Sequence, residues 1–227
     1  MKQFKYIIIA LLTLCMSCSR SLDQTPQGVI SGDDLNTPEN VDKMVIAAYA
    51  GLGNDNIHTS FSLWPWGSMR SGDAYKGGDS PGDNTDWHNY EIFSGNRPEI
   101  GNTDQMWYYL YIGVSRANDA LRRINQLGDS SYPQKKVRQA EVRFIRGHFY
   151  FLLKILFKYV PYIDETIPEA KYGEISNRAL SNDELWNKIA DDFRFGVENL
   201  PVTQPEIGRV NKEGATAYLA KTLLYQA

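Results

Sequence analysis

The sequence has 227 residues, two cysteines and a formal net charge of -3, with 27 acidic residues against 24 basic ones. An acidic chain is a poor partner for nucleic acid or for an anionic membrane surface, since both attract clustered positive charge. We therefore expect no nucleic-acid partner.

The N-terminal residues predict a lipoprotein signal peptide over residues 1–17, followed by lipidation at Cys18. Lysines precede an apolar run over residues 6–14, and the small residue Ser17 stands just before the cleavage point. The run is too short to cross a bilayer, which takes ~20 apolar residues. An ordinary secretory signal followed by a chance cysteine is the alternative.

Cleavage before Cys18 removes Cys15 with the signal peptide, so the mature protein is expected to form no disulfide. Two acyl chains on Cys18 suffice for stable membrane attachment, whereas one chain is marginal. Residues 18–36 would then be a polar, lipid-anchored tether.

A first helix is expected to begin after the N-cap Thr37, with Pro38 at its first position and Gly51 and Gly53 at its end. Residues 54–101 then break the helical periodicity and are rich in glycine, aspartate and aromatic residues. A loop of this length is uncommon in a compact domain and usually has a function.

Apolar residues at helical spacing predict four more helices in the remainder of the chain. The expected segments are residues 107–127, closed by Gly128; 133–160, ended by Pro161; 181–200, opened by the capping box of Ser181 and Glu184; and 211–227, beginning near Asn211. We therefore predict an all-α, tetratricopeptide-like helical-repeat scaffold with a long irregular aromatic-rich loop insertion, in which no strict repeat can be aligned.

Polar residues on these helices are expected to hold helices and loops together. Asn118 lies on an apolar stripe and should bond neighbouring backbone, because an unpaired buried amide would cost ~1 to 3 kcal/mol. Glu141, Arg143 and Arg146 lie about one helical turn apart and fit the same structural role.

Metal, cofactor and catalytic sites are not expected. The three histidines have no ligand spacing, and Asp79, Asp83 and Asp86 do not follow the spacing of a calcium hand, so solvated carboxylates explain them better. A nucleophile elbow and a phosphate-binding glycine loop are both missing, so the chain is not expected to be an enzyme.

Several motifs, in order, resemble the N-terminal part of the SusD/RagB family of Bacteroidetes surface lipoproteins. These motifs are Cys18 with Leu22 to Pro26, Trp107 to Asn118, Glu141 to Gly147, Arg178 to Pro201 and Gly208 to Ala215. Two positions depart from the family pattern: Lys158 replaces a glycine, which predicts a different local turn, and Gly214 replaces an alanine.

The resemblance implies a surface lipoprotein of the outer membrane that captures nutrients, usually oligosaccharides, for a TonB-dependent, SusC-like transporter. Three alternatives stay open: a family member for peptides or glycoproteins, a helical-repeat scaffold lipoprotein without a small ligand, and a glycosidase.

The aromatic loop is where a sugar ligand is expected, because flat rings suit the apolar faces of sugars and carboxylates suit their hydroxyl edges. The candidate ligand-binding residues are Trp64, Trp66, Asp73, Tyr75, Asp79, Trp87 and Tyr90. The alternative for each aromatic residue is an ordinary place in the core.

Members of the family are considerably longer than this chain, and the last helix reaches Ala227 without a capping glycine or proline. We therefore expect residues 37–227 to be a SusD-like N-terminal helical domain of a longer product. The buried face of the last helix is predicted to be Ala215, Leu219 and Leu223, with Tyr218, Thr222 and Tyr225 on its outer side.

Overall fold

The computed structural model describes residues 34–53, 63–95, 97 and 101–227. The predicted signal peptide and Cys18 lie outside these residues. The chain divides into one unit of Met1–Leu35 and a second of Asn36–Ala227, and every described helix belongs to the second. The helices are α2 (Pro38–Ala50), η1 (Gly51–Gly53), η2 (Pro65–Met69), α4 (Thr85–Glu91), α5 (Gly101–Gln126), α6 (Lys135–Phe157), η3 (Glu169–Glu174), α7 (Asn182–Asn199) and α8 (Lys212–Gln226).

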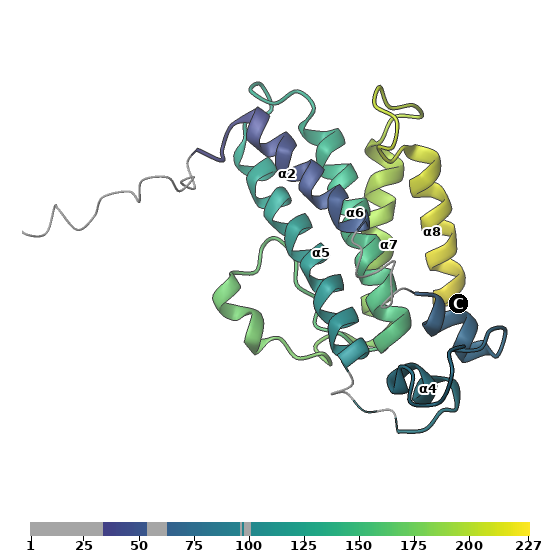
Figure 1. Ribbon diagram of the computed structural model, residues 1–227. Coiled ribbons are helices and arrows are strands. Elements are labelled where there is room, and N and C mark those ends of the chain that lie inside the picture. Colours follow the sequence, from purple (N-terminus) through teal and green to yellow (C-terminus); the bar gives the residue numbers. More distant parts are fainter. Residues whose placement is uncertain (1–33, 54–62, 96, 98–100) are drawn as a thin grey trace, which may run out of the picture. The chain divides into compact units, whose positions relative to one another are not determined.

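The described residues contain helices and loops but no strand, which confirms the predicted all-α class. Consecutive long helices lie side by side and antiparallel, α5 against α6, α6 against α7, and α7 against α8 (Figure 1). Helix α2 packs against both α5 and α6. None of the described helices is long and apolar enough to cross a membrane.

Small residues let the long helices approach closely where they cross. A Cβ atom at Gly113 of α5 would overlap the ring of Phe149 on α6. A Cβ atom at Gly147 of α6 would lie 3.1 Å from the ring of Phe193 on α7. Because interiors are packed at crystal-like density, a larger side chain at either glycine would force the helices apart.

Helix α6 is the centre of the fold and is buried on several sides. It packs against α2, α5 and α7. Its fully buried large side chains are Ile145, Phe149, Tyr150, Phe151 and Leu153.

The predicted N-caps Thr37 and Ser181 are confirmed, and Asn211, near which the last helix was expected to begin, is the N-cap of α8. The Thr37 hydroxyl accepts a hydrogen bond from the Asn40 amide at 3.3 Å. Ser181 and Glu184 form the reciprocal capping box of α7, and the Asn211 side chain accepts from the Gly214 amide at 2.9 Å. Each cap satisfies amides that have no partner within the helix.

Two sequence predictions about helix extent were wrong. Helix α5 begins at Gly101, well before Trp107, and its first turns bury Asn102 and Met106 on the same side as the later apolar residues. The sequence did not predict this start because Asn102 is polar and hides the apolar pattern. The segment predicted as irregular also contains η2 and α4. Both are too short to produce a recognisable helical periodicity.

The predicted faces of α8 were also wrong. Ala215 is buried as expected, but Leu223 is exposed and Thr222 is fully buried. The Tyr218 ring packs 5.0 Å from Phe144 of α6 and 5.3 Å from Phe193 of α7. Thr222 donates its hydroxyl to the Tyr218 carbonyl, which lets a polar side chain occupy the buried face.

Lys158 ends α6 in a left-handed turn in spite of its side chain. Its φ is +64° and its ψ is -53°. The Tyr159 amide donates to the Phe157 carbonyl at 2.7 Å, which closes a tight γ-turn around Lys158. Lys158 therefore adopts the positive φ that glycine would adopt without cost, and its backbone is strained.

Candidate functional site

The predicted ligand residues lie on residues 63–95, where a glycine-rich loop joins η2 to α4. Asn84 is the N-cap of helix α4, and its side chain accepts from the Trp87 amide at 3.5 Å. Gly78 has a φ of +79°, and a Cβ atom there would overlap the carboxylate of Asp83. The loop therefore requires glycine at this position.

Three of the predicted aromatic residues form a small hydrophobic cluster with Met69: Trp87 and Tyr90 are buried in it, and Trp66 packs against it. The Trp66 ring lies 5.0 Å from the Tyr90 ring and 6.5 Å from the Trp87 ring, with both contacts edge to face. Trp66 also lies 6.1 Å from Phe157 of α6, which attaches the segment to the long helices. Burial raises the pKa of the Tyr90 hydroxyl, which bonds the Thr103 hydroxyl of α5.

This cluster corrects part of the predicted ligand face. Trp87 and Tyr90 are buried, so their rings are core residues, as the alternative for each aromatic residue proposed. Trp64 and Tyr75 instead expose 45% and 86% of their surface.

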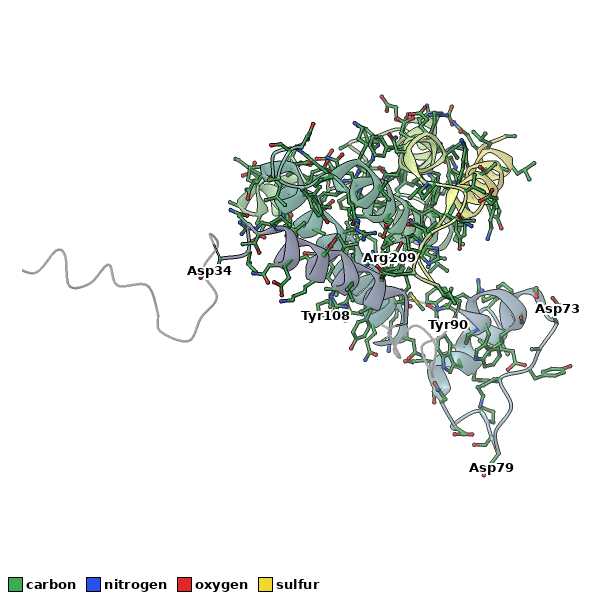
Figure 2. The ribbon with its side chains drawn as sticks, turned by 90° about the horizontal axis from the view of Figure 1, so that it is seen from above. Asp34, Asp73, Asp79, Tyr90, Tyr108 and Arg209 are labelled. Carbon is green, nitrogen blue, oxygen red and sulfur yellow. The ribbon has the colours of Figure 1, made fainter. Side chains whose placement is uncertain are left out.

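The predicted carboxylates are exposed but are not gathered at one point. Figure 2 shows Asp73 and Asp79 at separate ends of the segment. The Asp73 carboxylate accepts from the Ser71 hydroxyl at 2.7 Å. Lys76 is held within the loop, because its ammonium donates to the carbonyls of Ser80 and Asp83.

The sequence did not single out Arg70 and Phe93. The Arg70 guanidinium carbon lies 3.9 Å from the centre of the Phe93 ring, and Phe93 is exposed. Both residues flank the cluster of Trp66, Trp87 and Tyr90. A cation stacked on an exposed ring is a contact between residues far apart in the sequence, so no local pattern reveals it.

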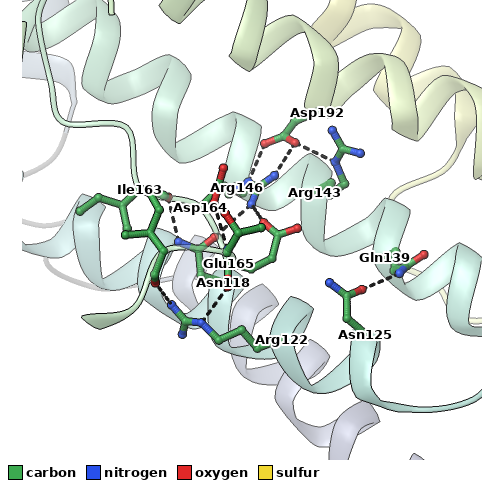
Figure 3. A network of polar contacts seen from close by, with 12 residues as sticks. Asn118, Arg122, Asn125, Gln139, Arg143, Arg146, Ile163, Asp164, Glu165 and Asp192 are labelled. Carbon is green, nitrogen blue, oxygen red and sulfur yellow. Dashed lines mark hydrogen bonds and ion pairs between the residues drawn. The ribbon is translucent and has the colours of Figure 1, made fainter. Parts of the chain in front are cut away.

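A second group of polar residues is buried between α5, α6 and α7 (Figure 3). Arg146 makes a bidentate contact with Asp192, at 2.8 Å and 2.7 Å, and Arg143 donates to the same carboxylate at 2.8 Å. Arg146 also donates to Asn118 at 3.1 Å and to Glu165. Burial alone would lower the pKa of Arg146, but the Asp192 carboxylate holds it well above its usual value.

The buried arginine cluster confirms the structural role predicted for Asn118, Arg143 and Arg146. Asn118 donates to the Ile163 carbonyl at 2.9 Å, so it bonds backbone as expected, but this backbone belongs to a distant segment and not to its neighbours in the sequence. Glu141 acts in the same way elsewhere on α6, accepting from Arg138 at 2.6 Å and from Arg209 at 2.9 Å. Every charge in these contacts has a partner, which suits structure rather than chemistry.

A cavity of about 230 Å³ lies beside α5, where its lining is mostly apolar. It is smaller than the roughly 300–1,000 Å³ of pockets for drug-sized ligands. Two of its polar groups are engaged within the protein: Tyr111 donates to the Pro161 carbonyl at 2.7 Å, and the Tyr172 hydroxyl accepts from Arg122. We assign no ligand to it.

Among the residues that the structure describes, no group of three or more histidine, cysteine, aspartate or glutamate side chains could hold a metal ion. The predicted carboxylates of the loop, Asp79, Asp83 and Asp86, belong to the residues searched.

A family model described as "Starch-binding associating with outer membrane" matches residues 22–224. A curated relative, SusD-like protein P2 of Formosa agariphila, is 25% identical over 233 residues, which cover 99% of this chain and 43% of the relative.

Solved structures with the same fold include a laminarin binding SusD-like protein, with a TM-score of 0.70 and 23% identity over 84% of this chain and 40% of that one. Surface glycan-binding protein A from Bacteroides fluxus gives a TM-score of 0.69 and 22% identity over 84% of this chain and 40% of its own. The Bacteroides thetaiotaomicron protein of that name, solved with laminarihexaose, gives a TM-score of 0.65 and 24% identity over 84% of this chain and 39% of its own. The chain thus spans less than half the length of these relatives.

Proposed function

Since the chain belongs to the SusD-like family of starch-binding proteins associated with the outer membrane, we propose that it is a glycan-binding lipoprotein of the cell surface. The observation that carries this proposal is the family match over residues 22–224. Relatives of the same fold include a laminarin binding SusD-like protein and a surface glycan-binding protein solved in complex with laminarihexaose. A neutral oligosaccharide is therefore the first ligand class to test.

The exposed aromatic residues of the 63–95 segment support a glycan surface in this chain. Trp64 and Tyr75 present rings to solvent, while Trp66 and Tyr90 attach the segment to the long helices through Phe157 and Thr103. A rigid base with exposed rings suits stacking, because the rings lose little freedom when a sugar binds. The glycine-rich loop allows close approach to the backbone.

We further propose that Cys18 carries the lipid anchor and that a TonB-dependent outer-membrane transporter is the partner. The signal-like N-terminus and the family's association with the outer membrane support this proposal. Cys18→Ala should abolish incorporation of labelled fatty acid and release the protein from membranes. Labelling that persists in this variant, or that is lost only in Cys15→Ala, contradicts the assignment.

Affinity electrophoresis of the full chain in gels containing starch or laminarin tests glycan binding. We expect retardation by at least one polysaccharide and a weaker effect in Trp64→Ala or Tyr75→Ala. A stacked ring contributes about 0.5 to 1.5 kcal/mol beyond area burial, which corresponds to roughly a three- to tenfold loss of affinity.

Tyr108→Ala is the matched control, because Tyr108 is an exposed tyrosine on α5, outside the segment. Equal losses in the control and the test variants would contradict a site on residues 63–95. Binding of peptides but of neither glycan would favour the peptide-binding alternative.

A further inference from the structure

The C-terminal end of α4 has a backbone that favours glycine but carries a phenylalanine. The Ser94 amide donates to the Asn89 carbonyl at 3.0 Å, and the Phe93 amide donates to the Tyr90 carbonyl at 3.4 Å. These two bonds form a Schellman motif with Phe93 at the position after the C-cap, which is usually glycine. Phe93 accordingly has a φ of +57°.

A bulky residue in this conformation is uncommon, and burial of the ring does not compensate for the strain. The Phe93 side chain is 63% exposed, and its neighbour Ile92 is 53% exposed. The ring therefore contributes little to a hydrophobic core. Strained residues of this kind concentrate at sites where a ligand uses the side chain.

Arg70 holds the Phe93 ring in place from one side. Its guanidinium carbon lies 3.9 Å from the ring centre, and Nη1 donates to the Tyr90 carbonyl at 2.9 Å. That carbonyl belongs to the last turn of α4, where a cation is electrostatically favoured. The arginine is thus fixed on the backbone of the same helix end that carries Phe93.

The Arg70 guanidinium also has donors that no described residue uses. A guanidinium has five N–H groups, and among the described residues the hydrogen bond from Nη1 to the Tyr90 carbonyl is the one that the Arg70 guanidinium forms. The half-buried guanidinium therefore covers one face of the Phe93 ring, and the exposed ring keeps its other face for a ligand. A sugar ring can stack its C–H face on the free face of Phe93, while the guanidinium edge donates to hydroxyls of an adjoining sugar of the same glycan.

We propose that Phe93 is a stacking platform for one sugar ring of the bound glycan, with Arg70 supporting the ring and donating to sugar hydroxyls. This inference rests on the proposed glycan-binding function and adds a contact that the exposed tryptophan and tyrosine of the segment do not provide. It also explains why a phenylalanine occupies a position where glycine would relieve strain.

The experiment uses Phe93→Gly in the full chain, with calorimetric titration of maltohexaose and laminarihexaose. Because glycine adopts positive φ without strain, we expect the melting temperature to rise by about 2–4 °C. Affinity should fall about three- to tenfold at the same time, through loss of the stacking contact. Phe93→Tyr keeps the ring and should keep the affinity.

Two controls separate stacking from other effects. Lys158→Gly relieves the same kind of backbone strain at the end of α6, so it should raise the melting temperature without changing affinity. Ile92→Ala removes an adjacent exposed apolar side chain and should leave affinity unchanged. A loss in Ile92→Ala equal to that in Phe93→Gly would indicate a general apolar contact surface, as for a protein partner, and would overturn the platform.

The outcomes distinguish this inference from the proposed function. Tight binding by the unaltered chain with unchanged affinity in Phe93→Gly overturns the platform and leaves glycan binding intact. Failure of the unaltered chain to bind either oligosaccharide contradicts the proposed function, and the platform with it. Increased stability together with reduced affinity supports both.

Discussion

Asp192→Asn should be strongly destabilising, because Asp192 is the shared partner of two arginines between α6 and α7. Its side chain is 1% exposed and accepts bonds of 2.7 to 2.8 Å from Arg143 and Arg146. Arg146 is itself only 4% exposed. The substitution leaves Arg146 buried with Glu165 as its sole carboxylate partner.

The expected loss follows from the burial of both groups. Removing one partner of a buried ion pair costs about 3–5 kcal/mol, a large share of the roughly 5–15 kcal/mol that stabilises a typical domain. For a domain of this size the melting temperature should fall by about 6–20 °C. Urea unfolding followed by circular dichroism measures the free energy, and calorimetry measures the melting temperature.

Asp191→Asn is the matched control, since Asp191 is the adjacent residue and pairs with Arg194 at the surface, where the two side chains are 53% and 48% exposed. Exposed pairs contribute about 0–1 kcal/mol, so the control should unfold almost as the unaltered protein does. A loss below about 1 kcal/mol for Asp192→Asn, or equal losses in both variants, would refute the assignment of this cluster as a structural clamp.

Two further predictions concern strain and pH. Lys158→Gly should raise the free energy of unfolding by about 1 kcal/mol, because it removes the left-handed strain at the end of α6; destabilisation measured in urea would show that the turn is not strained. Burial raises the pKa of the Tyr150 and Tyr162 hydroxyls above that of free tyrosine. The unfolded chain therefore loses protons first as pH rises above about 10, and stability should fall by about 1.4 kcal/mol per pH unit for each tyrosine. Urea unfolding at pH 9 to 11 measures this slope, and ionisation of these tyrosines near pH 10 in the folded protein, seen by ultraviolet absorbance, would contradict it.

The long helices were predictable because their signals are local. Thr37, Ser181 and Asn211 each cap a helix through a backbone amide only three residues away, and the apolar stripes of α5 and α6 follow the helical period. The prediction for α8 was wrong because its apolar residues do not form one stripe. Packing of Tyr218 against two neighbouring helices decides which side is buried.

The candidate site was predictable only as a region. Composition located the aromatic residues between the first two long helices, but burial divides them into core residues such as Trp87 and exposed ones such as Tyr75. That division depends on contacts with Phe157 and Thr103, which come from other parts of the chain. Phe93 was missed because a positive φ at phenylalanine has no sequence signature.

Hydrogen–deuterium exchange of the full chain, with and without saturating laminarihexaose or maltohexaose, tests most directly whether the aromatic segment binds glycan. The account predicts that bound glycan slows exchange over residues 63–95, around Trp64, Tyr75 and Phe93, and leaves α7 and α8 unchanged. Protection confined to α7 and α8, or no protection when calorimetry shows binding, would contradict the claim that this segment is the glycan-binding surface.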